Sequence, residues 1–123
     1  MLFRSPDMRM TPDRTRLIVT IDHLLMDFYN DCKYPSLEHI LEFHRHSLNV
    51  ESPMISTIDA YKYAVEYYES GVADAHCHAW TDEVFYAQFD ELCRNEIINS
   101  LYITDFEPTK HGFNEFCIIF TKK

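Results

Sequence analysis

Glycine is what this sequence lacks most clearly, because its 123 residues include only Gly71 and Gly112. In open α/β folds, a cofactor that carries a nucleoside is bound at a glycine-rich turn, where the backbone approaches the cofactor closely. Two isolated glycines cannot form such a turn. The sequence therefore excludes a standard cofactor site of this kind within these residues.

Positive charge, long apolar segments and paired cysteines are also scarce. The formal net charge is −9 at pH 7, and so acidic a surface repels nucleic acid phosphates and anionic membranes. No segment has the length of a transmembrane helix, and the N-terminus lacks the apolar core of a signal peptide. The four cysteines form no C-x-x-C pair. We therefore expect a cytoplasmic protein that binds neither nucleic acid nor a membrane.

The length and the apolar content indicate one folded domain. A chain of 123 residues can bury a modest core. Its hydrophobic fraction of 46% and aromatic fraction of 15% are typical of a folded protein rather than a disordered one. We expect a single domain over residues 1–123.

The last fifty residues have the clearest periodicity. Thr81 is a typical N-cap, and Asp82 and Glu83 place negative charge in the first helical turn, where the helix dipole favours it. Apolar residues then recur at helical spacing and predict a buried stripe. The stripe consists of Val84, Phe85, Phe89, Leu92 and Cys93.

Two strands should follow this helix. In residues 101–106 the period is two, so Leu101 and Ile103 should face one way and Tyr102, Thr104 and Phe106 the other. Pro108 ends this strand, as is typical at a sheet edge. Residues 116–120 are apolar at every position, so we expect both faces of that strand to be covered. The short connection makes the two strands antiparallel neighbours, with the last strand inside the sheet.

The short apolar segment of residues 1–5 predicts the end of a strand. Three helices should follow this strand, as an insertion over about residues 20–71. Thr20, Ser36 and Ser56 are typical N-caps, and Gly71 suits a left-handed C-terminal position. We expect breaks over residues 30–34 and 49–53. The predicted buried positions are Ile21, Leu24, Leu25 and Phe28, then Leu37, Ile40, Leu41, His44 and Leu48, then Ile58, Tyr61, Val65 and Tyr68.

Three short motifs lie towards the ends of the chain. They are P-D-M-R at residues 6–9, H-C-H-A-W-T at residues 76–81 and P-T-K-H-G-F-N-E-F at residues 108–116. With these motifs the chain resembles a bacterial subgroup, methyltransferase type 11-like, of the class I S-adenosylmethionine-dependent methyltransferases. In that subgroup P-D-x-R follows the fifth strand, H-x-H-x-W/F-T opens the last helix, and P-T-x-x-G-x-x-E-F joins the last two strands. Pro12 departs from the pattern, since an aromatic residue is expected there.

The resemblance implies a fold and a function. The first strand would be the family's fifth, and the last strand would insert antiparallel between it and residues 101–106. The implied fold is α/β and partially Rossmann-like, with a three-stranded mixed sheet, a C-terminal antiparallel hairpin and about four helices. The chain would be the substrate-facing C-terminal part of a methyltransferase, without the cofactor-binding N-terminal half. S-adenosylmethionine is implied for the full-length family, but we expect this chain alone not to bind it.

Substrate-binding candidates follow from position in the expected fold. Ligands of open α/β folds gather at the carboxyl ends of strands, and a polar segment follows the first strand. A solvated turn with weak local ion pairs would explain the same residues equally well. No catalytic residue is assigned, and the substrate is not identified. The candidates are Asp7, Arg9, Asp13, Arg14, His23, His76 and His78.

His76 and His78 share a face in an extended segment, so both imidazoles could reach one metal ion. D-x-H-x-H also opens the metal motif of amidohydrolases, but that family needs a barrel of ~250 residues. Zinc needs three or four ligands. The spacing of His39, Glu42 and His46 instead predicts a polar outer helix face. We therefore expect no metal ligand.

Three function classes remain open from the sequence. The first is the methyltransferase segment, which should associate with itself or with a cofactor-binding half. The second is a stand-alone non-catalytic module that binds through its aromatic surface. The third is a small metal-dependent hydrolase using the His76 and His78 pair.

Overall fold

The structure is a computed structural model that describes residues 1–51, 56–71 and 75–123, with side chains omitted for 47–51. The chain divides into two compact units, which we call unit 1 (residues 1–11 and 80–123) and unit 2 (residues 12–79). In the described residues, four α-helices and three strands confirm a fold of mixed helix and strand, and the Rossmann-like arrangement stays a prediction. The elements in chain order are β1 (Leu2–Pro6), the 3₁₀ helices η1 (Met8–Met10) and η2 (Pro12–Thr15), α1 (Ile21–Tyr29), α2 (Leu37–Glu51), α3 (Thr57–Glu69), α4 (Asp82–Arg94), β2 (Leu101–Glu107) and β3 (Glu115–Lys122).

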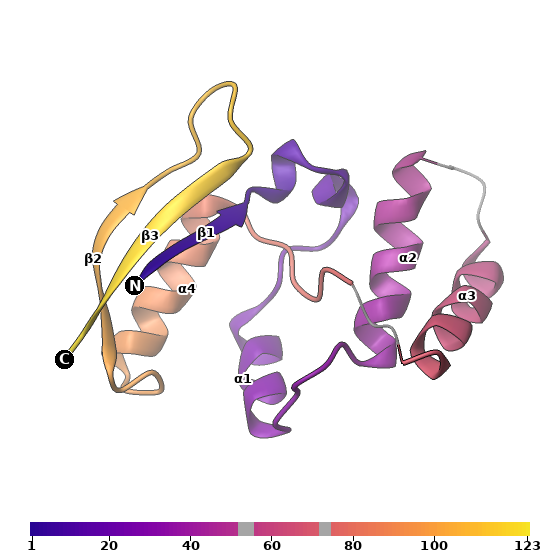
Figure 1. Ribbon diagram of the computed structural model, residues 1–123, viewed down its shortest axis with the longest axis horizontal. Coiled ribbons are helices and arrows are strands. Elements are labelled where there is room, and N and C mark those ends of the chain that lie inside the picture. Colours follow the sequence, from indigo (N-terminus) through magenta and orange to yellow (C-terminus); the bar gives the residue numbers. More distant parts are fainter. Residues whose placement is uncertain (52–55, 72–74) are drawn as a thin grey trace. The chain divides into compact units, whose positions relative to one another are not determined.

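Unit 1 contains the sheet, whose strand order is β1-β3-β2. The last strand of the chain therefore lies between the other two, as the sequence predicted (Figure 1). Both neighbouring pairs are antiparallel, with Phe3 opposite Ile118 and Ile103 opposite Phe120. The description of the sheet as mixed was wrong for these residues, because no two neighbouring strands run parallel.

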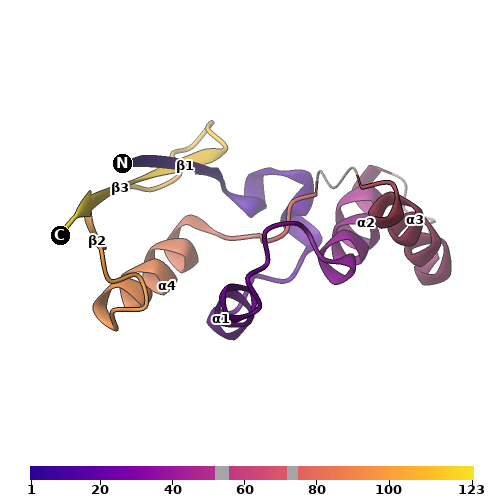
Figure 2. The ribbon, with the colours of Figure 1, turned by 60° about the horizontal axis from the view of Figure 1, so that its bottom comes forward.

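Helix α4 covers one face of this sheet (Figures 1 and 2). The helix begins after Thr81, whose side chain accepts a hydrogen bond from the amide of Val84 as an N-cap does. Phe85 is 1% exposed and stacks on Phe89, with ring centroids 4.2 Å apart. The predicted apolar stripe of α4 is confirmed, and its buried members pack against β3 through Phe116, Ile118 and Phe120.

Among the described residues of unit 1, no helix covers the opposite face of the sheet (Figure 2). Residues directly opposite one another across an antiparallel pair share a face. Leu2 lies opposite Ile119 and is 57% exposed, while Ile119 is 38% exposed. The prediction that both faces of β3 would be covered was therefore wrong within unit 1, although β3 is apolar on both faces.

A bulge in β2 corrects a second prediction. The pairing register between β2 and β3 shifts between Ile103 and Asp105. The shift moves Phe106 to the side of Leu101 and Ile103, and all three pack against the buried cluster. A strict period of two had placed Phe106 on the other face, because one inserted residue reverses the alternation of every later position.

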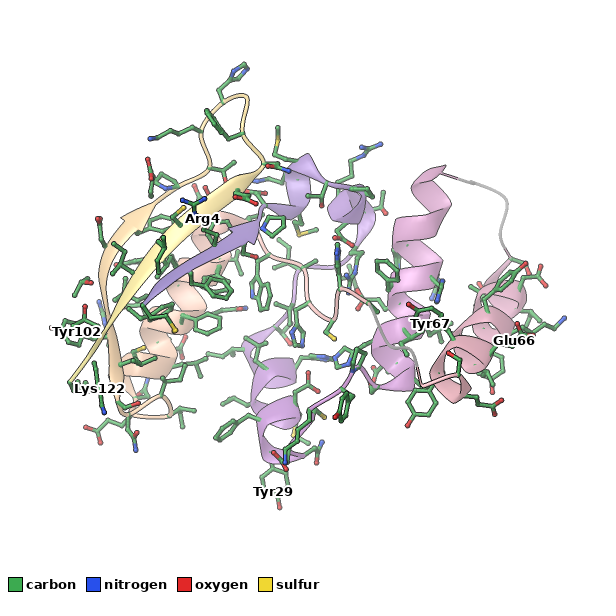
Figure 3. The ribbon with its side chains drawn as sticks, in the orientation of Figure 1. Arg4, Tyr29, Glu66, Tyr67, Tyr102 and Lys122 are labelled. Carbon is green, nitrogen blue, oxygen red and sulfur yellow. The ribbon has the colours of Figure 1, made fainter. Side chains whose placement is uncertain are left out.

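Unit 2 is built from η2 and the helices α1, α2 and α3. Helices α2 and α3 lie side by side (Figures 1 and 2). The buried positions of α3 are Ala60 and Ala64, and Tyr67 points towards α2 in Figure 3, with its ring 5.4 Å from that of His44. Small alanines let the two helices approach closely. The prediction that Ile58, Tyr61 and Tyr68 face inward was therefore wrong, since they are 64%, 49% and 51% exposed.

Helices α1 and α2 also depart from their predicted stripes. Thr20 caps α1 as predicted, but Phe28 is 74% exposed and none of the α1 side chains is buried. In α2, Ile40 is fully buried as predicted, whereas His39, expected on the outer face, is only 3% exposed. Helix α2 also continues to Glu51, into the break expected over residues 49–53. Leu48 lies outside the residues whose side chains are described.

Candidate functional site

Two carboxylates in unit 1 join the start and the end of the chain. Asp7 accepts hydrogen bonds from Arg9 Nε at 2.9 Å and from Thr109 Oγ1 at 3.0 Å. Asp82 accepts from Arg9 Nη2 at 2.6 Å and from the Thr109 amide at 2.8 Å. We call Asp7, Arg9, Asp82 and Thr109 the carboxylate junction. It brings together the P-D-M-R motif, the first turn of α4 and the P-T segment.

The junction is electrostatically satisfied. Asp7 is fully buried and Asp82 is 4% exposed, while the Arg9 side chain is 52% exposed. Burial alone would raise the pKa of Asp7, but hydrogen bonds from Arg9 and Thr109 outweigh it and hold the pKa at about 2. The same pairing raises the pKa of Arg9. Asp7 and Arg9 therefore neutralise each other, and Asp7 has no exposed atom with which to contact a substrate.

A second network in unit 2 centres on a residue that the sequence prediction missed. The Arg16 side chain has no exposed surface and pairs with Asp13 at 3.2 Å and with Glu42 at 3.1 Å. It also donates to the carbonyl oxygens of His76 at 2.6 Å and Cys77 at 3.1 Å. Arg16 thereby fixes the backbone of the extended segment that carries the two predicted histidines.

The remaining candidates divide between this network and a second cluster. His76 Nδ1 lies 2.6 Å from Asp13 Oδ2, whereas His78 Nε2 lies 2.8 Å from Asp27 Oδ2. The two histidines of the D-x-H-x-H motif therefore contact different carboxylates. Arg14 is exposed.

Three histidines and one aspartate of unit 2 form that second cluster, which we call the His₃Asp cluster. His23 and Asp27 lie one turn apart on α1, His39 is in the first turn of α2, and His78 precedes Ala79 in the extended segment. Four side-chain atoms, one from each residue, lie within 4.8 Å of one another. The three imidazole rings are mutually edge-on, with centroids 5.0 to 5.3 Å apart.

The electrostatics of this cluster are set by burial and by the shared carboxylate. Burial alone would raise the pKa of Asp27, but the hydrogen bond from His78 and the nearby imidazoles hold it below its ordinary value. Burial lowers the pKa of His78, which favours the neutral ring that could offer a lone pair. His23, Asp27, His39 and His78 are the described residues best placed to hold a metal ion.

A cavity of about 330 Å³ lies beside the His₃Asp cluster. Its wall includes the apolar side chains of Leu17, Ile18 and Val19, but most of the residues that line it are polar or ionisable, His23 and His78 among them. Such a wall offers hydrogen-bonding and charged groups to a small polar molecule. Cys77 also lines it, but burial raises the pKa of this thiol, so it is not an activated nucleophile.

Six of the seven sequence candidates belong to these networks, but several of their partners are not among the candidates. The spacing of His23 and Asp27 on one helix face is a signal that could have identified Asp27. The periodicity of α2 alone places His39 on the outer face. The sequence pattern marks Asp82 only as a first-turn acid and Thr109 only as part of a connecting motif.

Comparison of the chain with family models, curated proteins and solved structures finds no match. Nothing in these comparisons assigns a family or an activity. Among the described residues, no helix combines the length and the apolar character needed to cross a membrane.

We expect the Asp7→Asn variant to lose stability chiefly above pH 4. The folded-state pKa of about 2 lies below the ordinary value of 3.8, so the unfolded chain binds the proton more tightly. The stabilisation is therefore complete above about pH 4, declines as pH falls through this window, and is absent below about pH 2. It amounts to on the order of 2 kcal/mol.

Urea unfolding at a series of pH values measures this contribution. The Asp105→Asn variant is the control, because Asp105 is exposed on β2 and its substitution should change stability by less than about 0.5 kcal/mol. An unchanged acid dependence in Asp7→Asn would contradict the assignment.

We expect Arg16→Met to destabilise the protein by about 3 kcal/mol or more, because it leaves Asp13 and Glu42 without their buried cation. Arg14→Met is the matched control, since Arg14 is two residues away and exposed. The Arg14→Met substitution should change the free energy of unfolding by no more than about 0.5 kcal/mol. Denaturant unfolding followed by circular dichroism compares the two, and equal losses would show that Arg16 does not organise unit 2.

Proposed function

We propose that the chain is the substrate-facing, C-terminal part of a class I methyltransferase-like protein and does not itself bind S-adenosylmethionine. The observation that carries the proposal is the strand order β1-β3-β2, with β3 antiparallel to both neighbours. This is the arrangement that the resemblance implies for the fifth, last and sixth strands. The resemblance is to a family whose members transfer a methyl group, so the implied reaction class is methyl transfer.

The carboxylate junction supports the same proposal. The P-D-M-R and P-T segments are two of the three motifs that carry the resemblance, and they are far apart in sequence. In the structure Thr109 contacts both Asp7 and Asp82. Motifs that contact each other in this way have a shared structural reason to occur together. In this proposal the junction holds β1 and α4 in place and does not bind the methyl acceptor.

The acceptor would be bound by unit 2. The cavity beside His23 and His78 is lined partly by apolar side chains and mostly by polar or ionisable ones, which suit a small polar molecule. His23 and His78 are also two of the substrate-binding candidates that the sequence selects. The identity of the acceptor does not follow from these residues.

The uncovered face of the sheet gives the proposal a structural consequence. Leu2 and Ile119 are apolar and exposed on the face opposite α4. In a doubly wound α/β fold, helices cover both faces of the sheet. The proposal therefore assigns the covering of this face to a cofactor-binding segment, supplied in the same chain or by a partner. A segment of the form E/D-x-G-x-G-x-G there would provide the turn that these residues lack.

A second candidate is a stand-alone module that binds another molecule through aromatic side chains. Tyr29 and Tyr34 are 83% and 82% exposed, and Tyr29 extends from the end of α1 in Figure 3. Exposed tyrosines are enriched at interfaces, because they offer a large contact area at low entropic cost. Such a module would need no second chain to complete its sheet.

We expect no binding when S-adenosylmethionine is titrated calorimetrically into the purified chain. The physical reason is that two isolated glycines cannot form the turn that the cofactor requires. A full-length class I methyltransferase, titrated under the same conditions, is the positive control. Micromolar binding by this chain would overturn the proposed division of roles.

We expect the purified chain to self-associate through the uncovered face of the sheet. Ile119→Lys places a charge on that face and should raise the monomer fraction, measured by light scattering across a concentration series. Ile97→Lys is the matched control, because Ile97 is 46% exposed outside the sheet. A wild-type chain that stays monomeric at high concentration and melts cooperatively would favour the stand-alone module instead.

A further inference from the structure

Three imidazoles of the His₃Asp cluster share one carboxylate oxygen. Asp27 Oδ2 lies 2.8 Å from His78 Nε2, 3.1 Å from His39 Nε2 and 3.4 Å from His23 Nε2. One carboxylate oxygen offers about two lone-pair sites. Three imidazole nitrogens therefore converge on an atom that can accept from two of them.

Two of the rings also contact each other. His23 Nε2 and His39 Nε2 are 2.8 Å apart, so without another group one donates to the other while His78 Nε2 contacts Asp27. A single cation in place of these protons would accept a lone pair from each Nε2 and from the carboxylate at once.

The spacing of the four atoms suits zinc. Metal–ligand bonds of about 2.0–2.1 Å in a tetrahedron place the ligand atoms roughly 3.3 Å apart. Four of the six separations run from 2.8 to 3.4 Å, and all six lie within 4.8 Å, so a rearrangement of the rings is needed to complete that geometry. Three imidazoles and one carboxylate form a ligand set that suits Zn²⁺, whereas Mg²⁺ and Ca²⁺ prefer oxygen ligands.

The surroundings also hold one of the rings. His39 Nδ1 accepts a hydrogen bond from the Ser36 amide at 3.2 Å and lies 3.0 Å from Ser36 Oγ. In the neutral ring this leaves the proton on Nε2, so an ion bound at Nε2 would replace that proton. The second nitrogen of a metal-binding histidine is commonly held by such a partner.

Helix α1 is short, and the cluster adds to its packing. It has nine residues, of which Ile21, Leu24 and Leu25 are half-buried and none is fully buried. Helices shorter than about 12 residues are marginal in water without tertiary packing. His23 and Asp27 are half-buried and join α1 to His39 and His78, which come from two other segments of unit 2. The cluster therefore supplements the partial hydrophobic packing of this helix.

We propose that His23, Asp27, His39 and His78 bind one Zn²⁺ ion tetrahedrally, and that this ion fastens α1 to the rest of unit 2. With four protein ligands the site is closed, as structural zinc sites are. The site departs from the sequence-based expectation of no metal ligand, and it uses only one histidine of the His76 and His78 pair. It does not depend on the proposed function.

The first experiment titrates Zn²⁺ into the full-length chain after chelator treatment. We expect one equivalent to bind and the melting temperature to rise by on the order of 5 °C or more at saturation. Amide hydrogen exchange in residues 21–29 should slow when Zn²⁺ is added. Co²⁺ should give the intense visible absorption of a tetrahedral site, whereas Mg²⁺ should change neither the melting temperature nor the exchange.

Single-ligand variants locate the site. His23→Gln and Asp27→Asn alter half-buried residues and should fold, whereas His39→Gln changes a buried one. Loss of an outer hydrogen-bonding partner typically costs 10–100-fold in affinity, so loss of a direct ligand should cost about 100-fold or more. His76→Gln and His111→Gln are the matched controls. His76 contacts Asp13 instead of Asp27, and His111 belongs to unit 1, so both should retain wild-type affinity.

Several results would overturn the proposal. One is a folded wild-type chain, checked by circular dichroism, that binds neither Zn²⁺ nor Co²⁺. Another is unchanged affinity in both His23→Gln and Asp27→Asn. A loss of binding in His76→Gln as large as in His23→Gln would place the ion elsewhere. Stoichiometric binding without slower exchange in α1 would refute the fastening role.

Discussion

The buried carboxylate of Asp7 is the group on which the geometry of unit 1 depends. It sits where β1 ends, and its hydrogen bonds reach Arg9 on the next turn and Thr109 on the connection between β2 and β3. A carboxylate buried without such partners would cost several kcal/mol in solvation free energy. Because the partners come from distant parts of the chain, this requirement fixes where those parts meet.

Unit 2 meets the same requirement with the charge reversed. Its buried cation is Arg16, and the groups that satisfy it are two carboxylates and two backbone carbonyls. The apolar residues buried in this unit are few and mostly small, as Ala60, Ala64 and Ala79 illustrate. Polar networks therefore carry much of the organisation that a larger core would otherwise supply. A zinc ion in the His₃Asp cluster would extend this pattern to α1.

The two units also differ in what they leave exposed. In unit 1 an apolar sheet face remains uncovered, and this favours completion by another segment or chain. In unit 2 the exposed large apolar residues include several tyrosines, and a cavity has three histidines in its wall. The first kind of surface suits assembly and the second suits recognition of a smaller molecule. The proposed methyltransferase role uses both, one for the cofactor half and one for the acceptor.

Local sequence was sufficient wherever a single segment decided the outcome. Thr20, Ser56 and Thr81 cap their helices as predicted, because a cap is a contact between neighbours in the chain. Gly71 has the predicted positive φ of 70°. The antiparallel pairing of β2 with β3 and the interior place of β3 also followed, from the short connection and the apolar run. The pairing of β1 with β3 was implied only by the resemblance.

Only the tertiary structure decided which polar residues became partners. His39 was assigned to the outer face from the period of α2, yet it is buried because His23, Asp27 and His78 approach it from other segments. The bulge in β2 moved Phe106 to the core face for a similar reason, since its register is set by β3. Helix caps and turns depend on residues that are adjacent in the chain, so the sequence alone predicts them. Which face of a helix or strand is buried, and which polar residues meet, depends on segments that are distant in the chain. The periodicity within one helix or strand carries no information about those segments.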